Sequence, residues 1–384
     1  MQLTIAHNDF ASAVADTARA LPARPPAPVL AALKLAAADG SLTVSGFDFE
    51  VSGQATVKAD VTEPGTVLVS GRLLADITRV LKSKQPINLA LEGTRVVLTS
   101  GFTRYTLHTL PLEEYPALPT TAEATGTVSG AELAEAVAQV ATAAGRDDTL
   151  PVLTGIQLEL ADGKLTLAST DRYRFAVRTI DWTATDTSVE EATALLPAKS
   201  LTDTVKMLAG ADRIRVTLPG QTGVLGLADP ARSTTARVID GQLPQYSKLW
   251  PTPETINATA IVDTGELAAA IKRVALVSGS GHALQLTVTD GALSLDAGTS
   301  DDAQAVDTLD AQYDSGVGDF TIAFNPAYLL DGITAIDAPK TVLRMTERTK
   351  PALLTGADHK ATLDTLEFGG DALQYLLMPI RLSS

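Results

Sequence analysis

The sequence contains no cysteine among its 384 residues. This absence excludes disulfides, zinc sites built on cysteine and thiol nucleophiles, and it fits a reducing compartment. Histidine is nearly as scarce, with only His7, His108, His282 and His359. None of them has a metal-ligand spacing such as HExxH. We therefore expect no metal site and no cofactor.

Long hydrophobic runs are also missing. No apolar run reaches the roughly 18–20 residues of a membrane helix. The first residues, MQLTIAHNDF, have no basic region followed by an apolar core, so they do not form a signal peptide. The sequence thus predicts a soluble, cytoplasmic protein.

Catalytic motifs are absent as well: there is no GxSxG elbow, no Walker A loop and no GxGxxG after a strand. Asp48 and Asp171 recur at matching places after two hairpins, which is typical of a turn or cap residue rather than a catalyst. We expect a scaffold or ring rather than an enzyme. A three-domain scaffold or repeat protein and a hydrolase with an acidic site remain as alternatives.

The formal net charge is −15. A tight nucleic-acid binder is usually basic, because neutralised phosphates provide most of its affinity. Taken alone, this charge therefore argues against DNA binding.

An internal repeat of about 125 residues dominates the sequence. It shows in LKLAAADGSLTVSG (33–46), IQLELADGKLTLAS (156–169) and LQLTVTDGALSLDA (284–297). Each segment is an alternating strand, an Asp-Gly pair that favours a two-residue hairpin turn, and a second alternating strand.

Short amphipathic helices recur with the same period. Expected stripes, each spaced i, i+4, i+7, are Leu73, Ile77 and Val80; Leu201, Val205 and Leu208; and Leu329, Ile333 and Ile336. A second set of helices begins near residues 8, 130 and 264. The period is that of a whole domain rather than a solenoid unit.

We therefore predict an α+β protein of three similar domains, each with two helices packed on antiparallel sheets. The Pro- and Thr-rich stretch 112–126 and the Pro-rich stretch 244–254 read as linkers. The expected domains are residues 1–120, 127–251 and 255–384.

The C-terminal segment YLLMPIRL (375–382) is apolar almost to its end, so we expect it to be docked. Because Pro379 cannot donate to a sheet, the segment reads as an edge strand, or as a strand end that also lines a groove. The ending resembles that of the bacterial DNA sliding clamps, the β subunits of the replicative DNA polymerase. Further motifs similar to that family are 104–111, 150–155, 170–175, 243–246 and 325–328.

The resemblance covers the whole chain and implies a function. Two chains of this family join head to tail into a ring of six domains, and each chain forms half of the ring. The ring encircles duplex DNA without sequence preference and tethers the polymerase, and a clamp loader opens and closes it with ATP. It is a processivity factor without an active site of its own, although it is a subunit of the polymerase III holoenzyme.

The resemblance also implies a groove between domains two and three that binds short apolar peptides of the polymerase and the clamp loader. Its walls carry over to Leu153, Thr170, Arg172, Tyr173, Arg174, Phe175, Pro244, Lys248, Leu249, Tyr328, Met378, Pro379, Ile380, Arg381 and Leu382. The family often has Gly-His in place of Arg172-Tyr173 and Met in place of Ile380. Both differences alter the shape of the expected pocket.

For the dimer interface, the resemblance suggests Arg104, Tyr105 and Leu107, on a strand that would be an unpaired edge in a monomer, together with Leu276 and Val277 at the end of the first helix of domain three. Ordinary core packing is the alternative for the last two. The residues expected to face DNA are Arg24, Arg72, Arg79, Lys82, Arg146, Lys199 and Lys206. The six expected helices are together about neutral, which places the acid excess elsewhere.

Overall fold

The computed structural model describes residues 1–81, 85–120, 122–220, 223–245, 247–277, 283–289, 291–298, 303–370 and 372–381. The chain divides into two compact units: Met1–Ala134 with Asp181–Ile239, and Glu135–Ile180 with Asp240–Ser384. The middle copy of the repeat therefore contributes to both units. Each unit is considered by itself.

The first unit is built on one antiparallel sheet. Its strands follow one another as β14 (Thr183–Ala184), β10 (Gly126–Ser129), β16 (Arg213–Thr217), β17 (Val224–Ala228), β18 (Arg232–Arg237), β4 (Val51–Lys58), β3 (Ser41–Phe47), β2 (Ala32–Ala38), β6 (Gly65–Ser70), β9 (Thr103–Leu110), β8 (Arg95–Ser100), β7 (Ile87–Glu92), β1 (Gln2–Ile5) and β5 (Asp60–Glu63). Copy one supplies β1–β9, and copy two joins it where β18 pairs with β4. One sheet thus continues from the first copy into the second.

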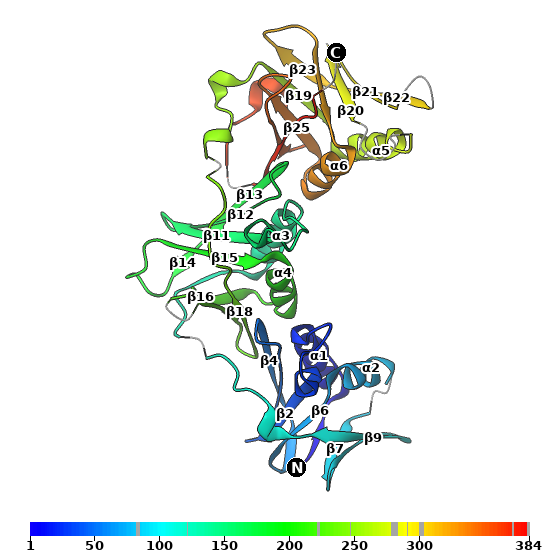
Figure 1. Ribbon diagram of the computed structural model, residues 1–384, viewed down its shortest axis with the longest axis vertical. Helices are drawn as coiled ribbons and strands as arrows, with labels where there is room; N and C mark the ends of the chain where they lie inside the picture. The colour runs from blue at the N-terminus through cyan, green and yellow to red at the C-terminus, as the bar shows by residue number, and fades with distance from the viewer. Residues whose placement is uncertain are drawn as a thin grey trace. The chain divides into compact units, whose positions relative to one another are not determined.

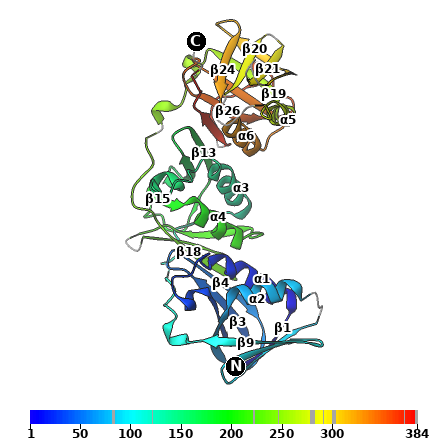
Figure 2. The ribbon, with the colours of Figure 1, turned by 45° about the vertical axis from the view of Figure 1, so that its right-hand side comes forward.

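Helices α1 (His7–Thr17) and α2 (Gly71–Val80) lie side by side on the sheet of copy one (Figures 1 and 2). Strand β15 (Ala192–Pro197) leads into α4 (Ala198–Met207), and α3 covers Gly130–Ala141. The core under α1 and α2 includes Phe10 and Val14.

The expected buried stripe of α2 is wrong by one residue. Leu74 and Ile77 are buried, whereas Leu73 is 50% and Val80 62% exposed. The other two predicted stripes are buried throughout. The reason is the start of the helix: in each of the three helices the buried Leu comes four residues after the N-cap, which is Ser70 in α2.

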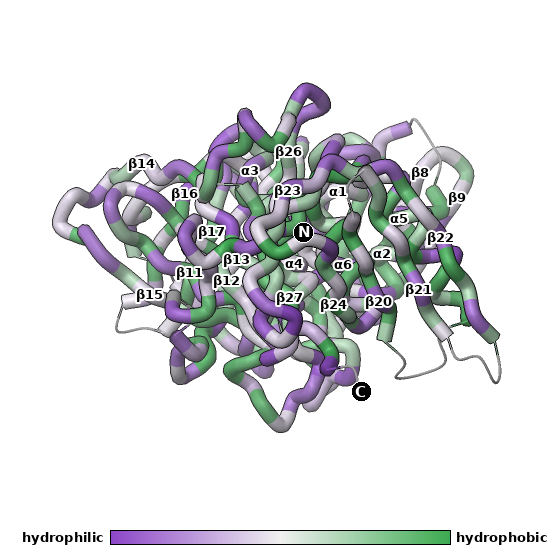
Figure 3. The backbone as a smooth tube through the Cα atoms, turned by 90° about the horizontal axis from the view of Figure 1, so that it is seen from above, coloured by the Kyte–Doolittle hydropathy of each residue, from purple (hydrophilic) through white to green (hydrophobic). Residues whose placement is uncertain are grey.

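The second unit contains the antiparallel series β11 (Gly155–Ala161), β12 (Lys164–Thr170), β13 (Arg174–Asp181), β27 (Gln374–Leu377), β26 (Ala352–Ala357), β25 (Lys340–Met345), β19 (Ala258–Asp263) and β23 (Gln312–Ser315). A second sheet has the order β22 (Gln304–Asp310), β21 (Ala292–Gly298), β20 (Leu284–Thr289) and β24 (Phe320–Phe324). Buried and half-buried residues alternate along β20 and β21, and hydrophobic and hydrophilic colours alternate along the strands in Figure 3.

Helices α5 (Thr264–Val274) and α6 (Pro326–Ala335) pack together in this unit (Figure 1). The side chain of Asn325 accepts hydrogen bonds from the backbone of Ala327 and Tyr328, and Pro326 occupies the first helical position. Short 3-10 turns lie at Ala18–Ala20, Pro28–Ala31, Leu112–Glu114, Pro151–Thr154, Ser247–Leu249, Pro253–Thr255 and Leu363–Thr365.

The C-terminal strand is not an edge strand, which corrects one of our expectations. Strand β27 lies between β13 and β26 and pairs with both. Pro379 is compatible with this inner position because it comes after the strand has ended at Leu377. The pairing of β13 with β27 joins copy two to copy three, as β4 and β18 join copies one and two.

The Asp-Gly turns are confirmed where the structure describes them. Asp39 and Asp162 have φ of 48° and 52°, and Gly40 and Gly163 both have φ of 70°. Two consecutive residues with positive φ are what a type I′ hairpin turn requires. The third expected turn includes Asp290, which lies outside the described residues.

Candidate functional site

A rigid turn between β12 and β13 forms the centre of the site. The carboxylate of Asp171 accepts hydrogen bonds from the backbone amides of Tyr173 (3.0 Å) and Arg174 (3.1 Å). The Thr170 hydroxyl donates to the carbonyl of Arg174 at 2.7 Å and accepts from the amide of Arg172 at 3.1 Å. Asp171 is thus the turn residue that we expected. The turn holds Arg172 at a positive φ of 80° and leaves the Tyr173 ring 54% exposed.

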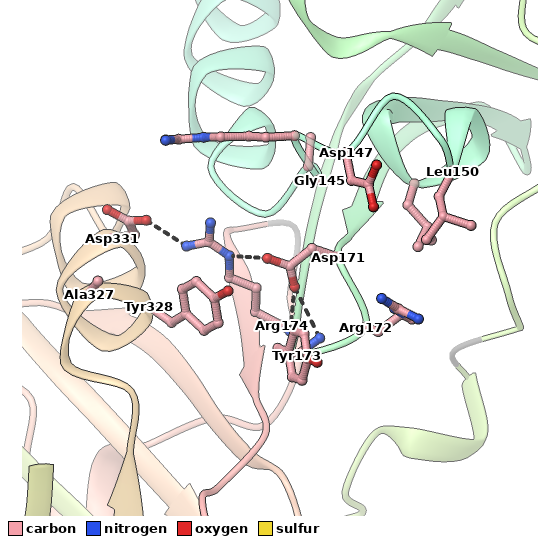
Figure 4. A pocket seen from close by; sticks show the side chains of 13 residues that line it. Gly145, Asp147, Leu150, Asp171, Arg172, Tyr173, Arg174, Ala327, Tyr328 and Asp331 are labelled. Carbon is pink, nitrogen blue, oxygen red and sulfur yellow. Dashed lines mark hydrogen bonds and ion pairs between the residues drawn. The ribbon is translucent and has the colours of Figure 1, made fainter. Parts of the chain in front are cut away.

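Arg174 is buried and lies between two carboxylates (Figure 4). Its Nε donates to Asp171 at 3.0 Å and its Nη1 donates to Asp331 of α6 at 2.6 Å. The guanidinium also lies 4.4 Å from the centre of the Tyr328 ring. Burial alone would lower the pKa of Arg174, but Tyr375 and the two carboxylates outweigh it and raise that pKa.

The hydroxyl of Tyr375, one of the largest fully buried side chains, completes this network. It accepts from Arg174 at 3.3 Å and donates to the carbonyl of Tyr328 at 2.9 Å. Burial raises the pKa of Tyr375, so the phenol stays neutral and remains a donor. Strand β27 and helix α6, both from copy three, are therefore tied to the turn of copy two.

A pocket of about 520 Å³ opens above this network (Figure 4). Its lining residues are Ala144, Gly145, Arg146, Asp147, Leu150, Leu153, Asp171, Arg172, Tyr173, Arg174, Ala327, Tyr328 and Asp331. The rings of Tyr173 and Tyr328 are stacked with centres 6.1 Å apart. Apolar walls with stacked aromatic rings and a rim of Arg and Asp suit an apolar peptide with a polar end.

The structure brings five of the expected groove residues to this pocket: Leu153, Arg172, Tyr173, Arg174 and Tyr328. The other expected groove residues that the structure describes are not among the residues that line it. Thr170 is buried within the turn, and Phe175 packs edge-on against Trp250 at 5.7 Å. The backbone amide of Met378 donates to the carbonyl of Tyr173, and that of Ile380 donates to Ala323. Pro244, Lys248, Leu249 and Arg381 are exposed and Pro379 is half-buried, and Leu382 lies outside the described residues.

Sequence reasoning missed several lining residues. Arg146, which we expected to face DNA, lines the pocket beside Asp147 and Leu150. Within the motif 150–155, the resemblance implies a groove position for Leu153 only, although Leu150 also lines the pocket. One feature of the sequence could have indicated Asp331, because it is an acid close to the buried face of the otherwise apolar helix α6.

The other basic residues expected to face DNA are exposed where the structure describes them, and several bind locally. Arg72 donates to the carbonyls of Pro22 and Ala23 at 3.0 and 2.7 Å. Arg79 pairs with Asp76 at 3.0 Å, and Lys199 with Asp203 at 3.9 Å. Arg24 and Lys206 are exposed, whereas Lys82 lies outside the described residues.

The residues expected at a dimer interface have mixed environments. Strand β9 is bonded to β8 along its length but to β6 only through Thr109 and Leu110. Leu107 is 3% exposed and belongs to the core, so only its main chain is available to a second chain, and Tyr105 packs against the same core. Arg104 is exposed and pairs with Glu92 at 3.6 Å. Leu276 is 86% exposed just after α5, and Val277 is half-buried.

Comparison with known proteins decides the family. The N-terminal, central and C-terminal domains of the DNA polymerase III beta subunit match residues 1–119, 127–245 and 251–366. The chain belongs to the family of beta sliding clamps. It is 50% identical to the beta sliding clamp of Streptomyces coelicolor over 100% of both chains. It is 38% identical to the beta sliding clamp homolog GriR of Streptomyces muensis over 99% of both.

Solved structures agree with this assignment. A sliding clamp of Pseudomonas aeruginosa bound to griselimycin has a TM-score of 0.89, with 25% identity and 100% of both chains covered. The three clamp domains of helices and antiparallel sheets are thereby confirmed, and this family is one of processivity factors rather than enzymes. Among the described residues, no helix is long and apolar enough to cross a membrane, and no cluster of three or more metal-binding side chains is found.

Proposed function

We propose that two copies of this chain close head to tail into a ring around duplex DNA and hold the replicative polymerase there. The observation that carries this proposal is the repetition of one sheet junction. Two such junctions lie within the chain, and each of the two strands that would form a third has a free side.

The two internal junctions share one register. Gly53 of β4 pairs with Thr234 of β18, and Ala176 of β13 pairs with Tyr375 of β27. Gly53 and Ala176 are equivalent, because each comes five residues after the Asp of its turn. In each copy, we start at the residue four positions before the first helix and follow the paired residues from one strand to the next. This path ends at Thr234 in copy two and at Tyr375 in copy three. The register at the first junction therefore predicts the register at the second.

The same counting predicts the junction between two chains. In copy one, the same path ends at Tyr105 of β9. In copy three, Ala305 of β22 occupies the position equivalent to Gly53. Ala305 should therefore pair with Tyr105 of the partner subunit, and Val306 with its neighbour Arg104. Within the described residues, β22 is the last strand of its sheet, and β9 is open on one side from 103 to 108.

Apolar exposure supports the same surface. Val306 of β22 is 60% exposed, and Leu276 follows α5, the helix that packs against β22. Covering an open strand edge and these side chains stabilises a dimer by burial and by main-chain hydrogen bonds. With three domains from each chain, the closed ring has six.

We further propose that the exposed cations of α2 and α4, Arg72, Arg79, Lys199 and Lys206, together with Arg24, face the DNA. They are few, and two are paired with carboxylates, which suits a ring held by topology rather than by tight phosphate binding. The chain would then work where the chromosome is replicated, in the cytoplasm. We also propose the domain limits 1–120, 127–251 and 255–384.

The pocket above Arg174 would take short apolar peptides from the polymerase and the clamp loader. Stacked Tyr173 and Tyr328 and the side chain of Leu153 offer the apolar surface, and Arg146 and Arg172 can meet the acidic groups of a peptide. We expect griselimycin, the ligand of the Pseudomonas aeruginosa clamp, to compete for this pocket.

A topological retention assay tests the ring. The chain is loaded on a nicked circular plasmid with its clamp loader and ATP, and free protein is removed by gel filtration. We expect the chain to stay with the circle and to leave when a restriction enzyme cuts the DNA. Equal retention on cut and uncut DNA would show binding without encirclement.

A further inference from the structure

Arg344 of β25 is a buried cation without a counter-charge. Its side chain is 5% exposed. Nη1 donates to the hydroxyl of Thr355 at 2.8 Å, and Nη2 donates to the carbonyl of Glu367 at 2.7 Å. Both acceptors are neutral, and the Phe368 ring lies 5.5 Å from the guanidinium carbon. No carboxylate of the described residues forms an ion pair with Arg344.

Two other arginines of the chain show what such a group ordinarily requires. Arg174 is bound by Asp171 and Asp331, and Arg232 by Asp229 and Asp16. A buried cation without an anion carries the full cost of desolvation. Arg344 shows that cost, because burial lowers its pKa and no carboxylate raises it again.

Arg344 lines a pocket of about 480 Å³ between β25, β26 and residues of 358–369 and 372–374. Thr355, Thr365 and Gln374 add polar groups to its wall, and Lys360 adds a second cation. This volume lies within the range of small-molecule sites, about 300–1,000 Å³. The pocket therefore combines space, hydrogen-bond donors and a buried arginine that forms no ion pair with a described carboxylate.

We propose that this pocket binds a small carboxylate ligand, whose carboxylate pairs with Arg344. The planar guanidinium can hold a carboxylate through two parallel hydrogen bonds. Asp358 and Glu367 also line the pocket, and their negative charges oppose a ligand with several charges close together. A carboxylate with one local charge is therefore preferred to phosphate.

Thermal unfolding of the full-length chain tests the site, with sodium succinate, acetate or inorganic phosphate as probes against chloride at one ionic strength. We expect the unfolding midpoint to rise saturably with succinate or acetate, and less with phosphate. A ligand that binds only the folded state must raise the midpoint in this way. A midpoint that is independent of all three probes overturns the proposal, and a larger effect of phosphate overturns the preference for carboxylate.

Calorimetric titration of variants locates the binding. Arg344→Gln removes the charge and leaves a shorter polar side chain, so the dissociation constant for succinate should rise at least about tenfold. Lys360→Ala, an exposed change that leaves the core intact, should weaken binding several-fold even if Arg344→Gln fails to fold. Arg348→Gln, an exposed arginine just after β25, is the matched control and should change nothing. Equal affinities in all variants would place binding elsewhere.

The emission of Trp250 provides a second readout. Its indole nitrogen donates to the side chain of Gln374, which lines the pocket. Succinate should therefore change the fluorescence with the same midpoint as the calorimetric titration. Two different midpoints would show that the heat arises at another site.

Discussion

The register predicted for the junction between two chains can be tested with one disulfide. The chain has no cysteine, so the double variant Val306→Cys with Arg104→Cys provides one possible pair of cysteines at each junction between the two chains. Val306 is structurally equivalent to Gln54, and Arg104 is structurally equivalent to Ser233. Gln54 and Ser233 pair at the junction of β4 and β18.

The geometry of that junction sets the expected distance. Thr56 donates to the carbonyl of Ala231 at 2.8 Å, and Arg237 to that of Glu50 at 2.9 Å. Every second pair is therefore hydrogen-bonded, with Cα atoms about 5.5 Å apart. The pair of Val306 with Arg104 of the partner subunit falls in this class. A disulfide spans Cα distances of about 4.4–6.8 Å, so this pair lies within its reach.

Non-reducing electrophoresis after mild oxidation measures the cross-link. We expect a covalent dimer, and a doubly linked ring that remains on circular DNA at high salt. The matched control is Val306→Cys with Thr106→Cys, which is offset by two residues and about 7–8 Å apart on the diagonal. It should cross-link about tenfold more slowly, because that distance exceeds the usual limit. Equal rates, or a faster control, would refute the register, and a dimer that cross-links in neither variant would refute this interface.

Three further predictions concern the two arginine networks. Arg174→Met should lower the free energy of unfolding by roughly 2–4 kcal/mol in urea titrations, because it leaves two carboxylates without their cation. A loss below about 0.5 kcal/mol would mean that the pairs are redundant. Tyr328→Ala should weaken binding of a polymerase C-terminal peptide by about 1–3 kcal/mol in fluorescence polarisation, with an unchanged dimer, whereas unchanged affinity would move the peptide elsewhere. The pKa of Asp229 lies below its ordinary value of 3.8, since the amide of Ala231 and the charge of Arg232 outweigh burial. Its stabilisation is therefore complete above about pH 4 and lost as the pH falls further, and Asp229→Asn should flatten this part of the pH–stability curve, whereas a curve of unchanged slope would exclude Asp229 as the cause.

Local patterns in the sequence predicted much of the fold. The Asp-Gly turns, the Asn325 cap and most helix stripes depend on residues close in sequence, so propensity and periodicity suffice for them. The stripe of α2 failed because Leu73 and Leu74 are adjacent, and spacing alone fits either one. The structure selects Leu74, which lies four residues after Ser70.

The site was less accessible to such reasoning because its contacts are long-range. Arg174 and Asp331 are 157 residues apart, and nothing local to either residue indicates the other. The resemblance to clamps supplied Arg174, Tyr173 and Tyr328 but not Asp331. Arg146 was assigned by charge to the DNA, although charge alone does not distinguish a pocket rim from a DNA-facing loop.

The two junctions within the chain and the proposed third junction, between chains, differ in the ion pairs that stabilise them. Arg174 joins the second junction to Asp331 of α6, and Arg232 joins the first to Asp16 of α1. At the third junction the place of Arg174 is taken by Ala303, and that of Arg232 by Thr103. Neither of these two positions holds an arginine, so this junction should be the first to open.

Supplying the missing arginine should strengthen the third junction. Asp76 stands six residues after Ser70, as Asp331 stands six residues after Asn325, so Ala303→Arg would face Asp76 of the partner subunit. Because Asp76 is exposed and already pairs with Arg79, the gain should be at most about 1 kcal/mol, or about fivefold in the dimer dissociation constant. Sedimentation across a dilution series measures that constant, and adding Asp76→Asn should cancel the gain. A gain that survives Asp76→Asn would show that the arginine acts through another contact, and no gain at all would show that the third junction does not repeat the geometry of the second.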